Sequence, residues 1–181
     1  AAAEVKPGDE LMLHDHRALQ GWDGPHSEAE GYLLGLLIGD GTLKADKAVL
    51  SVWAPELKAV GSDVSQAPAG VGSVMRVAEA ALRTAIDSRA DFQGWQRPIS
   101  GRGEVRLASA GLRDLAGHFG AVPGHKCITP AMEATSSDFH RGLLRGLFDA
   151  DGSVQGAQDK GVSVRLTQAD VEQLQAVQRM L

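Results

Sequence analysis

Two aspartates stand at the same place in a short string of residues that occurs twice in the chain. Asp40 belongs to the string LLGLLIGDG at residues 33–41, and Asp151 belongs to LRGLFDADG at residues 144–152. Each string has the character of an apolar helix that ends in Asp-Gly. Two neighbouring carboxylates repel each other, and each opposes the dipole at the C-terminus of its helix. Bound Mg²⁺ would relieve both problems because oxygen-rich sites suit this cation.

Small residues recur four positions apart in both strings, as Gly35 and Gly39 in the first and Gly146 and Ala150 in the second. Residues four apart share one face of a helix, and small residues let two helix axes approach closely. The spacing predicts two helices packed nearly backbone to backbone, with the two aspartates side by side at their ends. The glycines at positions 41 and 152 are expected to end these helices at the C′ position.

For either string alone, the alternative is a plain core helix that ends at a C-terminal glycine.

Residues 149–153, DADGS, also resemble part of a calcium-binding loop. The EF-hand loop needs glycine at its sixth position and glutamate at its twelfth. Here Gly152 is fourth and Lys160 is twelfth, which excludes that interpretation. Two copies that both end in Asp-Gly favour a shared site.

The repeated string resembles the motif of the LAGLIDADG homing endonucleases, which cut double-stranded DNA. The closest match is LFDADG at residues 147–152, and it extends over residues 139–143 and 153–154. The resemblance implies that Asp40 and Asp151, 111 positions apart (151 − 40), bind the catalytic Mg²⁺ or Mn²⁺ ions. The main chain of Gly39 and Ala150 would lie beside the metal. The first string departs from the second where Ile38 replaces an aspartate, at a position that is often not acidic in this family.

The same resemblance implies an α+β fold of two pseudo-symmetric repeats, each of αββαββα type with a saddle-shaped antiparallel sheet. Residues 28–125 are assigned to repeat 1, and residues 126–181 to repeat 2, which is incomplete. Apolar periodicity and turn residues agree with this order. Helices are expected at residues 28–40, 74–88, 111–119, 137–151 and 169–181, and strands at 42–44, 48–53, 104–107, 153–154 and 162–166.

Lys126 lies in the segment GHKCITP, 25 residues before Asp151 (151 − 126). In intein-encoded members of the family, a lysine followed by Ile-Pro-like residues occurs at a similar distance before the second motif. The resemblance therefore implies that Lys126 is the active-site lysine, whose ammonium stabilises charge or positions the attacking water. A surface lysine is the alternative. The corresponding lysine of repeat 2 would lie beyond Leu181.

The first twenty residues resemble the end of the N-terminal part of an intein splicing domain, through the turn KPGD at residues 6–9 and the strand after it. Residues 1–20 are assigned to a remnant of that domain, and residues 21–27 to a linker. Residues 13–53 resemble inteins of ribonucleotide reductases. Ala1 is not a splicing nucleophile and no terminal His-Asn pair is present, so this chain is not expected to splice. In the full precursor its partners would include the flanking exteins.

The formal net charge of −5 argues against nucleic-acid binding, but the charge is unevenly distributed. Residues 76–145 contain ten Lys or Arg against seven Asp or Glu. Spread arginines of this kind can follow the phosphates of double-stranded DNA. The candidate DNA contacts are Arg97, Arg102, Arg106 and Arg165. A solvated face with incidental charge is the alternative, because no dense basic patch exists.

The remaining composition describes an ordinary globular chain without a transmembrane run. Cys127 is the single cysteine, so no intramolecular disulfide is possible, and a cytoplasmic (intracellular) monomer is expected. The resemblance implies an intein-encoded, metal-dependent DNA endonuclease acting at the intein insertion site. The alternatives are a nucleic-acid-binding module without nuclease activity, whether degenerate or maturase-like, and a structural insert that binds nothing.

Overall fold

The computed structural model describes Lys6 and residues 21–54, 69–86, 92–96, 102–157 and 161–181. Apart from Lys6, the expected splicing-domain remnant lies outside the described residues, and so does Arg97. The helices are α1 (Glu28–Ile38), α2 (Ala69–Ala85), α3 (Ala110–His118), α4 (Pro130–Glu133), α5 (Ser137–Asp151) and α6 (Val171–Met180). The strands are β1 (Thr42–Leu43), β2 (Ala48–Trp53), β3 (Glu104–Ser109), β4 (Gly152–Ala157) and β5 (Gly161–Leu166). The expected mixed α+β fold with antiparallel sheets is confirmed.

Helix α1 is a core element surrounded by protein. Ser27 is its N-cap, and the reciprocal bonds between Ser27 and Glu30 form a capping box. Every residue from 31 to 38 is buried. A helix that is apolar on all sides is stable only when other elements cover it on all sides. This burial places the start of the loop that carries Asp40 next to the core.

Helix α5 packs along α1 in the same direction, and glycines make the contact. A Cβ atom on Gly31 would collide with the main-chain oxygen of Phe139, and one on Gly142 would collide with that of Glu28. The close packing of α1 and α5 expected from the sequence is therefore confirmed. It begins at Gly31 and Gly142, which precede the two repeated strings. Each helix uses its glycines against the backbone of the other.

The next turn of the helix pair repeats this reciprocal arrangement. A Cβ atom on Gly35 would collide with the main-chain oxygen of Leu143, and one on Gly146 with that of Tyr32. Gly35 and Gly146 are 111 positions apart (146 − 35), as are Tyr32 and Leu143. The contacts within the pair are thus related by the same offset that separates the two aspartates.

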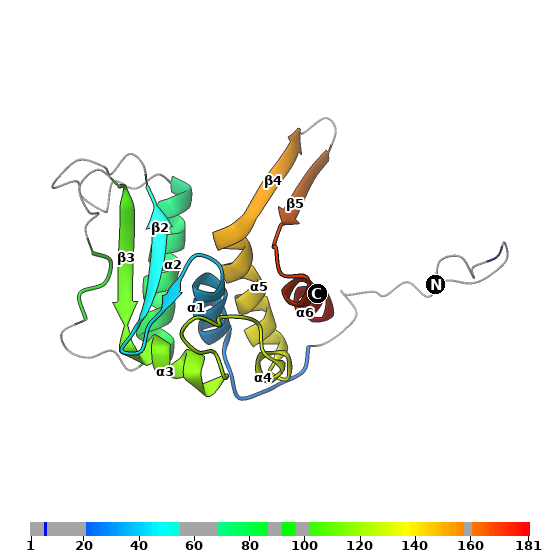
Figure 1. Cartoon of the computed structure of the whole chain (residues 1–181). Coiled ribbons are helices and arrows are strands. Elements are labelled where there is room, and N and C mark those ends of the chain that lie inside the picture. The colour runs from blue at the N-terminus through cyan, green and yellow to red at the C-terminus, as the bar shows by residue number, and fades with distance from the viewer. Residues whose placement is uncertain (1–5, 7–20, 55–68, 87–91, 97–101, 158–160) are drawn as a thin grey trace.

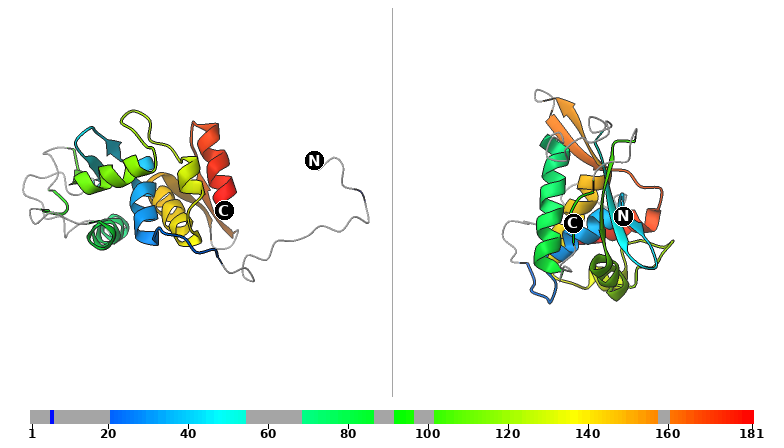
Figure 2. Two further views of the ribbon diagram at one scale, coloured as in Figure 1. Left: turned by 90° about the horizontal axis from the view of Figure 1, so that it is seen from below. Right: turned by 90° about the vertical axis from the view of Figure 1, so that its left-hand side faces the viewer.

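Two antiparallel sheets extend from the helix pair within the described residues. Strand β2 lies between β1 and β3, with Thr42 opposite Val49 and Ala48 opposite Ser109. Strands β4 and β5 form a separate hairpin that follows α5 directly. Figure 1 shows these sheets diverging on opposite sides of α1 and α5. Seen from below, α1 and α5 lie between α2 and α6 (Figure 2).

A chain segment that precedes β3 pairs with this strand at one point. The main-chain nitrogen of Gln96 donates to the carbonyl of Arg106 at 2.7 Å, as an isolated antiparallel bridge. The bridge brings together the chain on the two sides of residues 97–101, which lie outside the described part. The regular partner of β3 is β2.

The glycines after the two aspartates do not act as left-handed helix ends. Gly39 is the C-cap of α1, and Gly152, the C-cap of α5, has φ −76°. Gly41 has no positive φ either. A Cβ atom on Gly41 would lie 2.6 Å from Leu37 Cα, and one on Gly152 would collide with the main-chain oxygen of Phe148. Close approach of the preceding turn, and not a left-handed backbone, explains glycine at both positions.

Residues 21–27, expected as a linker, lie against the start of α5, whose N-cap is Ser136 and not the following residue. The main chain of Trp22 accepts from Ser137 N at 3.1 Å and donates to Ser137 Oγ at 3.0 Å. Ser136 Oγ donates to the carbonyl of His26 at 2.7 Å. The Trp22 ring meets that of His140 edge-on, with centroids 5.1 Å apart. This segment ties the N-terminal ends of α1 and α5 together.

Candidate functional site

The two candidate aspartates come from the C-terminal ends of the paired helices. Helix α5 ends at Asp151, and Asp40 follows α1 by two residues. A Cβ atom on Gly39 would collide with that of Ala150 and would lie 3.3 Å from Asp151 Oδ2. The close helix contact therefore continues to the helix ends, which lie between the two sheets in Figure 1. The structure brings together Asp40, Asp151, Gly39 and Ala150, as the sequence predicted.

The surroundings of Asp40 disfavour its negative charge. Partial burial raises the pKa of the Asp40 carboxyl, and the charge of Asp151 raises it further. The ammonium of Lys126 acts in the opposite direction. Like charges held close together destabilise the ionised form, and a nearby cation stabilises it. A cation bound beside Asp40 would therefore stabilise the ionised form of its carboxyl.

Lys126 reaches this site from the segment between α3 and α4. Its Nζ atom donates to three main-chain oxygens at the end of α1: those of Leu37 at 3.2 Å, Ile38 at 2.9 Å and Gly39 at 2.5 Å. The last carbonyls of a helix have no partner within the helix, and they form the negative end of its dipole. Lys126 thus caps α1 where Asp40 leaves it.

The charge of Lys126 is opposed by burial and supported by the aspartates. Partial burial lowers the pKa of the Lys126 ammonium, whereas Asp151 and Asp40 raise it. An ammonium between a helix C-terminus and two carboxylates compensates part of the negative charge there. When Asp40, Asp151 and Lys126 are all ionised, their summed charge is −1. A further cation would therefore be attracted to them.

The carboxylates available as metal ligands fit a Mg²⁺ ion that keeps several of its waters. They do not fit an ion surrounded by protein ligands alone. Among the described residues, no group of three or more His, Cys, Asp and Glu side chains could hold a metal ion together. Mg²⁺ usually keeps several waters and binds through one or two carboxylates together with substrate phosphates. Asp40 and Asp151 supply those carboxylates. The carbonyl of Gly39, expected beside the metal, instead accepts from Lys126.

Gln168 is a site residue that the sequence did not reveal. It lies two residues after β5, and its Nε2 donates to Asp151 Oδ2. The amide therefore helps to fix the orientation of the Asp151 carboxylate. A single glutamine after a strand has no distinguishing pattern, so only the course of the chain after β5 shows this role.

Asp149, the extra acidic residue of the second string, interacts with Tyr32 and Arg145. The hydroxyl of Tyr32 donates to Asp149 Oδ2 at 2.8 Å, and Arg145 Nε lies 3.9 Å from the same oxygen. The Arg145 guanidinium also lies over the Tyr32 ring, 5.2 Å from the ring centroid, which is close enough for a cation–π interaction. Burial and then Asp149 raise the pKa of the Tyr32 hydroxyl, which stays protonated as a donor.

A polar hollow of about 340 Å³ lies on the sheet of β1, β2 and β3. Its basic side chains are Lys44, Lys47 and Arg106, and Glu104 is its only acidic lining residue among those described. Arg106 was predicted from the sequence as a DNA contact. The two lysines, which flank the turn between β1 and β2, were not. Arg106 binds Glu104 with two hydrogen bonds of 2.8 and 2.7 Å. The Arg106 charge is therefore partly compensated before any ligand binds.

The other candidate arginines are not gathered at this hollow. Arg102 is exposed just before β3, and Arg165 is exposed on β5 in the other sheet. Arg165 Nε donates to Ser163 Oγ at 3.2 Å on the same strand. A ligand that contacted both sheets would have to span the helix pair, and a nucleic-acid duplex has that extent.

Comparison with known proteins bears on this geometry. A family model described as a LAGLIDADG-like domain matches residues 138–181, which cover α5, the β4–β5 hairpin and α6. The match includes Asp151 and Gln168, and it extends past the end of α6 to Leu181. No curated protein matches the chain.

The matched segment contributes Asp151 and Gln168 to the site. LAGLIDADG-like domains are typical of homing endonucleases and of related nucleic-acid-binding modules, and they generally act with divalent metals. The aspartate at the end of α5 lies inside the matched region, and Asp40 and Lys126 lie outside it. No helix in the described ranges has the length and apolar character needed to cross a membrane.

Proposed function

We propose that this protein is a LAGLIDADG homing endonuclease that makes a metal-dependent double-strand break in DNA. The observation that carries the proposal is the convergence of Asp40, Asp151 and Lys126 at the ends of two glycine-packed helices. Reciprocal glycine contacts between α1 and α5 hold the two helix ends that carry the aspartates close together. A site of this form can present equivalent groups to the two strands of a duplex.

Hydrolysis of a phosphodiester adds water across a P–O bond and leaves one phosphate and one hydroxyl end. Mg²⁺ or Mn²⁺, when bound, would supply Lewis acidity and a more acidic water. Asp40 and Asp151 would hold the ion, and Gln168 would orient the Asp151 carboxylate. The Lys126 ammonium would stabilise negative charge that develops on the phosphate.

The two sheets are the proposed DNA contacts, since a β-ribbon can enter the major groove and read base edges. Lys44, Lys47 and Arg106 belong to the first sheet, and Arg165 belongs to the second. Together with Arg102, they would contact phosphates on both sides of the helix pair. Sequence-independent contacts of this kind set affinity and its dependence on salt.

The pseudo-symmetric two-repeat arrangement and the intein context are parts of the same proposal. The first is supported by the constant offset of 111 positions between the paired contacts of α1 and α5. The intein context, including a ribonucleotide reductase host, is supported by the resemblance of residues 1–20 and 13–53. DNA cleavage would then occur at the insertion site of the intein, in the cytoplasm and by a monomer.

A nucleic-acid-binding module without nuclease activity is the second candidate. Two observations favour it: Lys126 is engaged with three carbonyls, and Asp151 Oδ2 already accepts from Gln168. A protein of this kind would use the sheets for binding and retain the aspartates as relics. It would bind DNA in a salt-sensitive way and would not cut it.

Cleavage selection on a randomised duplex library separates the two candidates. The chain is incubated with the library and Mg²⁺, and ligation of adaptors to the cut ends recovers any cleaved sequence. The proposal predicts a recurrent cleaved sequence that disappears with Asp40→Asn or Asp151→Asn and persists with Asp138→Asn, which changes an exposed carboxylate at the other end of α5. Binding of the library without recovered ends would support the second candidate.

A further inference from the structure

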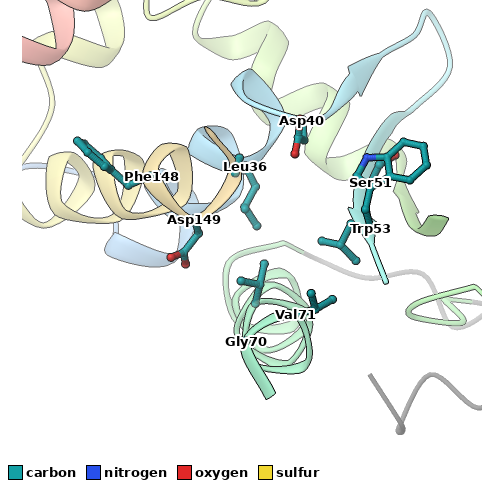
Figure 3. A pocket seen from close by; sticks show the side chains of 11 residues that line it. Leu36, Asp40, Ser51, Trp53, Gly70, Val71, Phe148 and Asp149 are labelled. Atoms are coloured by element: carbon teal, nitrogen blue, oxygen red, sulfur yellow. The ribbon is translucent and has the colours of Figure 1, made fainter. Parts of the chain in front are cut away.

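A second cavity adjoins Asp40 on the side of α2 and β2. It has a volume of about 480 Å³, within the range of small-molecule sites. Figure 3 shows Asp40 and Leu36 at the end of α1, Asp149 on α5 and Val71 on α2 around one common space. Among the side chains that line this cavity, the proposed cleavage mechanism uses Asp40 alone.

The walls of the cavity are mostly apolar. Its apolar lining residues are Leu36, Val52, Trp53, Val71, Val74, Phe148 and Ala150. Although it is large and aromatic, Trp53 is 55% exposed. Apolar walls with few polar groups are the usual surroundings of a small organic ligand. The indole face of Trp53 can also attract a cation.

The charged groups of the cavity are all of one sign. Asp40 and Asp149 line it, and its described lining contains no Lys, Arg or His. In the part of the chain that the structure describes, Tyr32 and Arg145 both approach Oδ2 of Asp149. A ligand in the cavity can therefore use the other carboxylate oxygen. Charge complementarity selects a cationic group on an apolar body.

We propose that this cavity binds an organic amine whose ammonium pairs with Asp149 and whose hydrocarbon or aromatic part packs against Leu36, Val71 and Trp53. A metal ion alone would leave the apolar walls in water, and a neutral hydrocarbon would bring no positive charge to the Asp40 and Asp149 carboxylates that line the cavity. Both requirements are met by an arylalkylamine. The inference goes beyond the proposed nuclease activity and does not depend on it.

The probe is 4-phenylbutylamine, and its matched neutral control is 4-phenylbutan-1-ol. Both are titrated into the full chain by calorimetry, with two-dimensional NMR to show that each variant is folded. The amine is expected to bind with a dissociation constant on the order of 1 mM or tighter, as its size permits. The alcohol is expected to bind at least about tenfold more weakly, because a charge-assisted hydrogen bond is lost.

Three variants locate the binding. Asp149→Asn keeps an oxygen acceptor for Tyr32 but removes the charge, and should weaken the amine about tenfold. Val71→Phe fills the cavity and should abolish binding of both compounds. Asp138→Asn, on the same helix but outside the cavity, should leave the affinity for the amine unchanged.

Several results would overturn the proposal. Equal affinity for amine and alcohol would show that Asp149 does not select charge. Unchanged binding by a folded Val71→Phe protein would place the ligand elsewhere, as would an equal effect of Asp138→Asn and Asp149→Asn. The absence of any heat or NMR shift with folded wild-type protein at millimolar amine would remove the site altogether.

Discussion

Lys126 Nζ lies 2.5 Å from the carbonyl oxygen of Gly39, the residue that also separates the end of α1 from Asp40. One ammonium therefore caps a helix and faces a pair of carboxylates. The two roles are separable by experiment. Capping contributes to the stability of the fold, whereas the positive charge near the aspartates affects the binding of phosphate and of metal.

Replacing Lys126 with methionine should destabilise the protein. The substitution keeps the apolar stem and removes the ammonium that bonds three carbonyls, at a cost of about 1–2 kcal/mol in the free energy of unfolding. Urea unfolding at neutral pH measures the change. Lys44→Met, at an exposed position, is the control and should change stability by less than about 0.5 kcal/mol. Equal stability of the two variants would show that the Lys126 ammonium does not cap α1.

Replacing Gly146 with alanine should disrupt the helix pair. The new Cβ would collide with the main-chain oxygen of Tyr32, so α1 and α5 must separate, at a cost of about 3 kcal/mol or more. Gly117→Ala is the matched control, because a Cβ there meets nothing within 4 Å and α3 gains helix propensity. Thermal unfolding should therefore shift in opposite directions for the two variants. A harmless Gly146→Ala would contradict the backbone contact.

Replacing Asp40 with asparagine should stabilise the metal-free protein at neutral pH. The pKa of Asp40 is raised in the folded state above its ordinary value of 3.8, so ionisation disfavours folding. Wild-type stability is thus lost as the pH rises through the raised pKa, and no difference from the variant is expected below 3.8. The gain at neutral pH should be no more than about 1 kcal/mol, because the side chain is exposed.

Chemical unfolding of both proteins across this pH range, in a chelating buffer, measures the difference. Added Mg²⁺ should reduce it, since a bound cation relieves the repulsion in the wild-type protein. An advantage of Asp40→Asn that was constant at every pH would contradict the assignment to this carboxyl.

Replacing Glu104 with glutamine should strengthen DNA binding. Hydrogen bonds from Arg106 lower the pKa of the buried Glu104 carboxyl and keep it charged, and this charge compensates the guanidinium. Glutamine retains an acceptor and releases the charge of Arg106 for a phosphate. The plot of log affinity against log salt for a labelled duplex should steepen by about one. Asp138→Asn is the control, and an unchanged slope for both would exclude Arg106 as a phosphate contact.

The two aspartates of the site could be predicted from the sequence more fully than the residues that contact them and the nearby helix end. The two Asp-Gly strings and the four-residue spacing of small residues were local patterns, so Asp40, Asp151 and the close helix pair could be anticipated. Lys126 followed from resemblance alone, and its capping bonds depend on a loop whose course no local pattern determines. Gln168 was missed for the same reason.

The roles of glycine and of the basic residues were also only partly predictable. Gly31 and Gly142 lie outside the repeated strings, yet they make the same backbone contact. Gly41 and Gly152 looked like left-handed helix ends because glycine is common there, but close packing explains them. Lys44 and Lys47 became visible only when strand pairing placed them beside Arg106 in one hollow.

Manganese binding tests the central claim most directly, because it requires no knowledge of the DNA target. Free Mn²⁺ is measured by electron paramagnetic resonance during titration of the full chain. The account predicts binding by the wild-type protein and a loss of affinity of about tenfold or more in both Asp40→Asn and Asp151→Asn, with Asp138→Asn unchanged. Wild-type affinity in both folded aspartate variants would contradict the assignment of a shared cation site to the ends of α1 and α5.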